Sequence, residues 1–138
     1  MDLGSHKTTD NIALNKAFTV AMGDAAHVVQ CDYLGLVSGR KEPDKLSMAG
    51  FTVRRSEFVN APVINELPLT LECELIRADG GKYFGRIVNT VADESILNPE
   101  GKIDLSKFHP ITYDTSTMGY YALGERVGQA FSDGKRLI

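Results

Sequence analysis

The first residues that could do chemistry form a short polar run near the start of the chain. His6-Lys7-Thr8-Thr9 directly precedes a segment that begins like a helix. Free backbone N–H groups at a helix start, beside one ammonium and two hydroxyls, suit a phosphomonoester. The alternative is an ordinary helix cap with a solvated lysine, and spacing alone favours the cap.

A second polar cluster lies in the loop from Ser38 to Lys45. It combines cationic side chains, including Arg40, with the flexible Gly39, so it could wrap around an anionic or polar ligand. Asp44 could equally orient Lys45 or cap a short helix. Charge runs are usually solvated surface, and this reading is favoured from the residues alone.

The remaining polar groups do not combine into a catalytic pattern. His27 and Cys31 stand four residues apart on a predicted helix, but no third ligand joins them, so we interpret them as structural. His109 has no nucleophile signature around it. Glu72 and Glu74 lie on the polar side of a predicted strand, where solvated carboxylates are expected. The sequence therefore predicts neither a catalytic residue nor a metal site.

The elements that must position these clusters follow from hydrophobic periodicity. A short helix is expected from Thr8 and a strand from Phe18 to Met22, where apolar residues alternate. A second, amphipathic helix is expected from Asp24, and a third over 43–49, between Pro43 and Gly50. The side of the second helix that should face the core contains Ala25, Val28, Val29, Tyr33 and Leu36.

The second half of the chain predicts a hairpin and a closing helix. Residues 69–76 alternate as a half-buried strand with Cys73 inward, the 79–81 turn Asp-Gly-Gly follows, and 83–91 suits the partner strand. A last strand is expected over 118–123. A helix is expected over 125–131, and its apolar face would pack on the domain or on a second subunit, with the domain favoured.

Composition sets the class of protein. The chain has 138 residues, of which 43% are hydrophobic and 24% charged, so one globular domain over 1–138 is expected. The formal net charge of -3 argues against nucleic acid and anionic membrane as partners. Two distant cysteines and the lack of an apolar leader predict a cytoplasmic location. The element order is not that of a doubly wound nucleotide-binding fold.

The ordered motifs of the chain resemble those of the flavin reductase-like proteins. The similarity runs from about residue 5 to the end, and it rests on the order and spacing of many short motifs. These are His6 to Ile12, Phe18 to Val20, Cys31 to Tyr33, Ser38 to Arg40, Asp44-Lys45, Ala49 to Phe51, Ala61-Pro62, Leu69 to Cys73, Phe84 to Val88, and Asp93-Glu94.

The resemblance implies an α+β, mainly β fold: a split β-barrel with short flanking helices. It also implies a homodimer that holds FMN near the subunit interface, with NAD(P)H as a possible co-substrate that gives hydride to the flavin. Carried over by position, one group of residues lies around the FMN phosphate: His6, Lys7, Thr8 and Thr9. A second group lies near the ligand or the interface: Ser38, Gly39, Arg40 and Lys45.

The chain departs from the family pattern at its start. Family members carry several strands before the His-x-Thr motif, and here five residues precede His6. We therefore expect a single domain that matches the C-terminal portion of the family, without the usual first barrel strands. Three functions stay open: a flavin reductase, a flavin-binding electron-transfer protein without NAD(P)H turnover, or an oligomeric module that binds no flavin.

Overall fold

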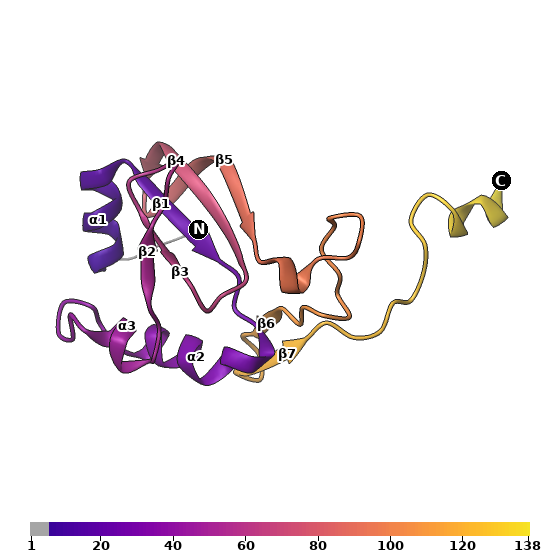
Figure 1. The fold of residues 1–138 in the computed structure, drawn as a ribbon, viewed down its shortest axis with the longest axis horizontal. Helices are drawn as coiled ribbons and strands as arrows, with labels where there is room; N and C mark the ends of the chain where they lie inside the picture. Colours follow the sequence, from indigo (N-terminus) through magenta and orange to yellow (C-terminus); the bar gives the residue numbers. More distant parts are fainter. Residues whose placement is uncertain (1–5) are drawn as a thin grey trace.

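The computed structural model describes residues 6–138, which form a body of antiparallel sheets and short helices (Figure 1). The helices are α1 (Lys7–Asn15), η1 (Ala25–His27), α2 (Val28–Leu36), α3 (Lys45–Met48), η2 (Glu94–Ile96) and η3 (Asp133–Leu137). The strands are β1 (Ala17–Ala21), β2 (Val53–Arg55), β3 (Pro62–Ile64), β4 (Leu69–Asp79), β5 (Lys82–Ala92), β6 (Ile111–Asp114) and β7 (Gly119–Ala122). Within 6–138, no helix has the length and apolar character needed to cross a bilayer.

The β4–β5 hairpin is the centre of the fold, as the alternation predicts. β1, β4 and β5 form one antiparallel sheet with β4 in the middle, and Phe18 of β1 stands opposite Cys73 of β4. Gly80 and Gly81 make the turn with positive φ angles of 54° and 83°, a region that glycine enters without a Cβ penalty. β2 pairs with β3, and β6 with β7, also antiparallel.

Both faces of β4 are covered at its middle, which corrects one expectation. Cys73 is buried as predicted, but Glu72 on the opposite face is buried as well, at 1% exposure. Its carboxylate accepts a hydrogen bond of 2.5 Å from Asn89 on β5. The β2–β3 ribbon lies over this face, since Thr19 of β1 donates to the carbonyl of Pro62 at 2.6 Å. Periodicity identified one buried face, but it could not show that a ribbon covers the other.

The helix predicted from Asp24 forms in two parts and is not buried on its expected side. Asp24 caps the short η1, and α2 continues to Leu36. None of the α2 residues is fully buried by residues 6–138, and Val29 and Leu36 are largely exposed. The prediction that these side chains pack on the core is therefore wrong for Ala25, Val29 and Leu36, whereas Val28 and Tyr33 are half-buried.

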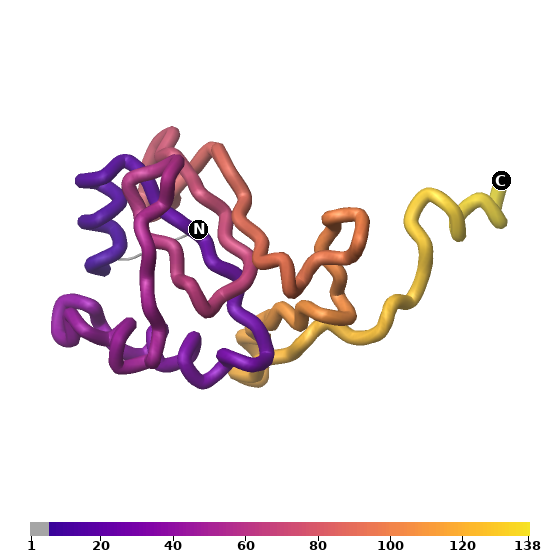
Figure 2. Tube along the Cα trace, in the orientation of Figure 1, coloured from indigo at the N-terminus to yellow at the C-terminus, as the bar shows by residue number. Residues whose placement is uncertain are grey.

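The C-terminal segment differs most from the prediction. Residues 123–129 have no regular structure, so the closing helix over 125–131 does not form. Figures 1 and 2 show this segment running away from the body as an arm that ends in η3. Gly124 and Gly128 lower helix propensity here, and the described part of the domain does not pack against the segment to offset that cost.

Candidate functional site

The N-terminus of α1 presents the first predicted cluster at the surface. His6 is the N-cap residue with extended backbone (φ −118°, ψ 163°), and its side chain makes no cap hydrogen bond with residues 6–138. The Thr9 hydroxyl donates to the His6 carbonyl at 2.6 Å. Lys7 and Thr8 are exposed. The Thr9 N–H donates to the His6 carbonyl at 3.1 Å. Because the side chain of His6 does not cap the helix, the other first-turn N–H groups remain suited to an anion.

The loop from Ser38 to Lys45 packs against this helix end, so the structure brings the two predicted clusters together. A Cβ placed on Gly39 would lie 3.6 Å from Lys7 Cβ and 3.7 Å from Lys45 Cε. Arg40 Nη2 donates to Asp10 Oδ2 at 2.8 Å, which ties the loop to α1. These distances place Gly39 between Lys7 of the first cluster and Lys45 of the second.

Two members of the second cluster have structural partners. Ser38 Oγ accepts from the backbone N–H of Arg40 at 3.3 Å, and the Ser38 carbonyl accepts from the next two N–H groups along the loop. Lys45 Nζ donates to the carbonyl oxygens of Leu34 at 2.7 Å and Val37 at 2.8 Å. The Lys45 ammonium therefore satisfies carbonyls at the C-terminal end of α2, where a cation is favourable.

Replacing Lys45 by methionine is expected to lower the free energy of unfolding by about 1–3 kcal/mol, because two carbonyls lose a charged donor. Urea denaturation monitored by circular dichroism measures this change. The matched control is Lys41→Met, since the Lys41 ammonium makes no hydrogen bond or ion pair with the described residues. Equal stability of the two variants would contradict this structural role of Lys45.

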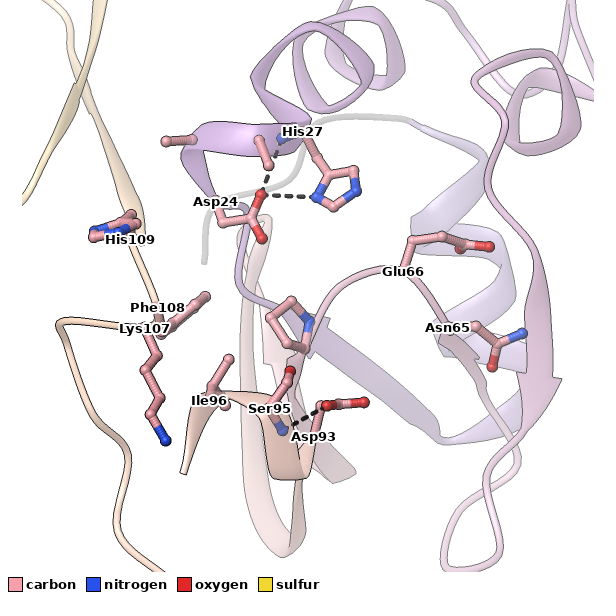
Figure 3. A pocket seen from close by; sticks show the side chains of 13 residues that line it. Asp24, His27, Asn65, Glu66, Asp93, Ser95, Ile96, Lys107, Phe108 and His109 are labelled. Atoms are coloured by element: carbon pink, nitrogen blue, oxygen red, sulfur yellow. Dashed lines mark hydrogen bonds and ion pairs between the residues drawn. The ribbon is translucent and has the colours of Figure 1, made fainter. Parts of the chain in front are cut away.

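A separate hollow of about 300 Å³ is lined by η1 and by residues from 65–68, 93–96 and 107–109 (Figure 3). Asp24 Oδ1 accepts from the His27 backbone N–H at 3.0 Å and contacts His27 Nδ1 at 2.8 Å. Glu66 lines the same hollow, and the hydroxyl and backbone N–H of Thr52 hold the pKa of its carboxyl below the usual value. Sequence reasoning missed this group, although Asp24 three residues before His27 is a cap spacing that signals the contact.

The absence of a metal site stays a prediction. His27 contacts Asp24, and Cys31 follows on α2, but no group of three or more ligating side chains comes together in this part of the chain. His27 instead lies against Phe51, with ring centroids 5.8 Å apart. The interpretation of His27 as a structural residue agrees with these contacts.

Both cysteine thiols are free, and their surroundings raise their pKa values. Burial is the main cause at Cys31, with a smaller contribution from the negative charge of Asp24, and burial is the cause at Cys73. The thiolate is the reactive form. We therefore expect slow alkylation by iodoacetamide at pH 8 and a rate that still rises at a pH where an ordinary thiol has levelled off. A normal profile in the folded protein would contradict this, and the protein in urea is the control.

The arrangement at α1 can hold an anionic group. Its donors are helix N–H groups, the Lys7 ammonium and the Thr8 hydroxyl, which together suit a phosphate. Neither a carboxylate–histidine pair nor an activated nucleophile lies among the described residues of this cluster. A bound cofactor would therefore have to supply any redox chemistry at this site.

Comparison with known proteins gives consistent matches. Residues 4–122 match the family model described as "Flavin reductase like domain". No curated protein gives a significant match. Among solved structures, flavoredoxin of Desulfovibrio vulgaris (Miyazaki F) is 34% identical, with a TM-score of 0.89, over 94% of this chain and 71% of that one. Flavoredoxin from Methanosarcina acetivorans is 33% identical, with a TM-score of 0.87, over 99% and 74%.

A more distant structure supports the fold alone. It is an FMN-binding domain of a flavin reductases-like enzyme from Shewanella baltica OS155, 18% identical with a TM-score of 0.80, over 94% of this chain and 72% of that one. These likenesses confirm the expected split-barrel fold with short helices.

Proposed function

This chain belongs to the flavin reductase-like domain family, whose function is of the flavin-binding oxidoreductase type, and on that basis we propose that it binds FMN through the N-terminus of α1. The observation that carries the proposal is the convergence of two clusters far apart in sequence. Arg40 of the loop pairs with Asp10 of α1, and a Cβ added at Gly39 would meet Lys7 of the same helix. Their chemistry fits a phosphate group.

Each residue of the site has a distinct proposed role. His6, Lys7, Thr8 and Thr9 surround the phosphate, with the ammonium of Lys7 as its counter-charge. Gly39 lies between Lys7 and Lys45, while Arg40 fixes the loop to α1 through Asp10. Ser38 and Lys45 hold the loop and the end of α2 in shape through the bonds described above. The last two residues therefore act by positioning.

For the reaction, we propose hydride transfer from NAD(P)H to the flavin. FMN, when bound, would supply the hydride-accepting chemistry, so the protein would need to supply only binding and orientation. This agrees with a site in which no carboxylate–histidine pair lies among the described residues. NAD(P)H oxidation that requires added FMN and increases with protein concentration is the expected observation.

A second function is favoured by the comparisons. The two relatives of 33% and 34% identity are flavoredoxins. By this alternative, the chain binds FMN, receives electrons from a partner enzyme and does not turn over NAD(P)H. Saturable FMN binding without NAD(P)H oxidation would favour it over the reductase. A chain that binds no flavin under any condition would instead leave the third function, an oligomeric module.

The domain organisation, the oligomeric state and the cellular location of the protein are also proposals. We propose one domain over 1–138, a homodimer and a cytoplasmic location. The unpaired state of Cys31 and Cys73 supports a reducing compartment. The exposed apolar side chains of α2 support the homodimer, since apolar surface of this kind is normally covered in an assembly.

A further inference from the structure

The C-terminal arm, defined as residues 123–138, exposes apolar side chains almost completely. Val127 is 102% exposed and Phe131 is 98% exposed, and Leu137 and Ile138 are similar. Isolated apolar residues on a surface are ordinary, but a run of fully exposed ones marks an interaction site. The arm therefore has apolar side chains to bury, and residues 6–122 of its own chain do not cover them.

The arm nevertheless has its own local structure. The carboxylate of Asp133 accepts from the backbone N–H of Gln129 at 2.8 Å, and the Asp133 carbonyl accepts from Arg136 Nε at 3.1 Å. Arg126 Nε donates to the carbonyl of Gly128 at 3.1 Å. Within 6–138, the hydrogen bonds found for residues 124–138 connect the arm only to itself. Its turns are formed without help from the body, which suits a segment that docks elsewhere.

The body carries a matching apolar surface, the α2–α3 stripe, defined as Val29, Tyr33, Leu36 and Met48. The first three are spaced i, i+4, i+7 and so share one face of α2. Val29 and Leu36 are 75% and 77% exposed, and Met48 Sδ accepts from the Tyr33 hydroxyl at 3.7 Å. A helix that is apolar on most of its sides is normally buried, so the stripe also needs a cover.

The arm leaves the body close to this stripe. Tyr120 of β7 donates to Asp32 of α2 at 2.8 Å, and the arm begins directly after β7. The arm nevertheless runs away from its own α2 (Figures 1 and 2). A segment that starts beside its own stripe and leaves it uncovered can reach the same stripe on a second copy across a two-fold axis. Extended, residues 123–138 span up to about 50 Å.

The area involved suits a stable dimer. Phe131 contributes ~150–250 Å² when buried, and the three aliphatic side chains contribute roughly 100 Å² each, or about 500 Å² per arm. Two exchanged arms, each covering an equal area of its stripe, remove roughly 2,000 Å² in total. Stable interfaces bury ~1,200–2,000 Å².

We infer that two copies of this chain exchange their C-terminal arms, each arm covering the α2–α3 stripe of the other copy. This inference rests on the homodimer of the proposed function and names the segment that holds it together. Sequence analysis left open whether this apolar segment packs on the domain or on a second subunit, and its exposure on the single chain points to the second subunit.

The test compares the mass in solution of the full chain with that of a chain ending at Leu123. Light scattering after size exclusion should give twice 15.1 kDa for the full chain and a single-chain mass for the shortened one at the same concentration. The double variant Val127→Asp/Phe131→Asp should weaken the dimer at least tenfold. Ser132→Asp is the matched control, since it adds a charge to the arm and removes no apolar side chain, and it should leave the dimer intact.

The outcomes separate this inference from the proposed homodimer. A shortened chain that stays dimeric with unchanged affinity overturns arm exchange and leaves the homodimer standing, whereas a full chain that is monomeric overturns both. Folding is checked by circular dichroism, and the shortened chain should melt as a folded protein. As a direct test of where the arm docks, Cys31 is replaced by serine in every chain. A Phe131→Cys chain mixed with a tagged Leu36→Cys chain should then form a disulfide. The same chain mixed with a Lys102→Cys chain should not form one. Equal disulfide yields from the two mixtures would contradict docking of the arm on the α2–α3 stripe.

Discussion

Replacing Lys7 by glutamate is expected to weaken FMN binding by roughly 100-fold or more. One charged hydrogen bond to a phosphate contributes about 1.5–3 kcal/mol, and the new carboxylate adds repulsion at the same place. Quenching of flavin fluorescence on titration with protein measures the change. Lys7 is exposed, so the fold should not suffer.

The control for this variant is Lys102→Glu, which makes the same change of charge in the 98–102 turn, away from α1 (Figure 1). It keeps the net charge of the two proteins equal, so any general repulsion of FMN affects both. FMN affinity should stay within about twofold of the original chain. A Lys7→Glu variant that binds FMN as tightly as Lys102→Glu would place the phosphate elsewhere.

Gly85→Ala is expected to cost about 2–3 kcal/mol of stability, the largest effect we anticipate from adding one methyl group. A Cβ at Gly85 would lie 2.5 Å from Cζ and 2.9 Å from Cε1 of Phe18, and 3.2 Å from Cβ of Cys73. The Phe18 ring would have to leave its place on the central sheet, and overpacking of this kind typically costs about 1–3 kcal/mol. Urea denaturation followed by circular dichroism gives the free energy of unfolding.

A double-mutant cycle identifies the cause. If the clash with Phe18 is responsible, Gly85→Ala should cost much less in a Phe18→Ala background. Gly35→Ala is the matched control: the new Cβ meets nothing within 4 Å, and alanine favours the helix. That variant should be unchanged or more stable by up to about 1 kcal/mol. Additive effects of Gly85→Ala and Phe18→Ala would contradict this explanation.

Sequence patterns predicted the helices and strands that are defined by residues close together in the chain. Alternating residues and a Gly-Gly turn define β4 and β5, and the start of α1 falls within one residue of the predicted helix start. The short β2, β3 and β6 were not predicted. Three or four residues are too few for a periodic signal, and these strands exist because of what they pair with.

Tertiary contacts explain the errors. Glu72 has the spacing of a solvent-facing residue, but the β2–β3 ribbon buries it and Asn89 supplies its hydrogen bond. Val29 and Val127 have the spacing of core-facing residues, yet the single chain leaves both exposed. An apolar face in a sequence indicates that something covers it, and the sequence does not say whether that partner is the same chain.

The candidate site could likewise be predicted only in part from the sequence. The chemistry of His6 to Thr9 and of the Ser38–Lys45 loop could be inferred from residue types, but their proximity could not. They are joined by the Arg40–Asp10 pair and by the close approach of Gly39 to Lys7, both of which connect positions about thirty residues apart. Residue spacing also could not predict that Lys45 donates hydrogen bonds to carbonyls at the end of α2.

The most direct test of the central claim is a titration of the purified chain with FMN and, in parallel, with riboflavin, which has the same ring system without the phosphate. We predict saturable binding of FMN and binding of riboflavin at least about tenfold weaker, because the phosphate contacts at α1 contribute a charged hydrogen bond or more. Equal affinity for the two flavins would contradict phosphate recognition at α1. The absence of binding to either would contradict the flavin-binding function itself.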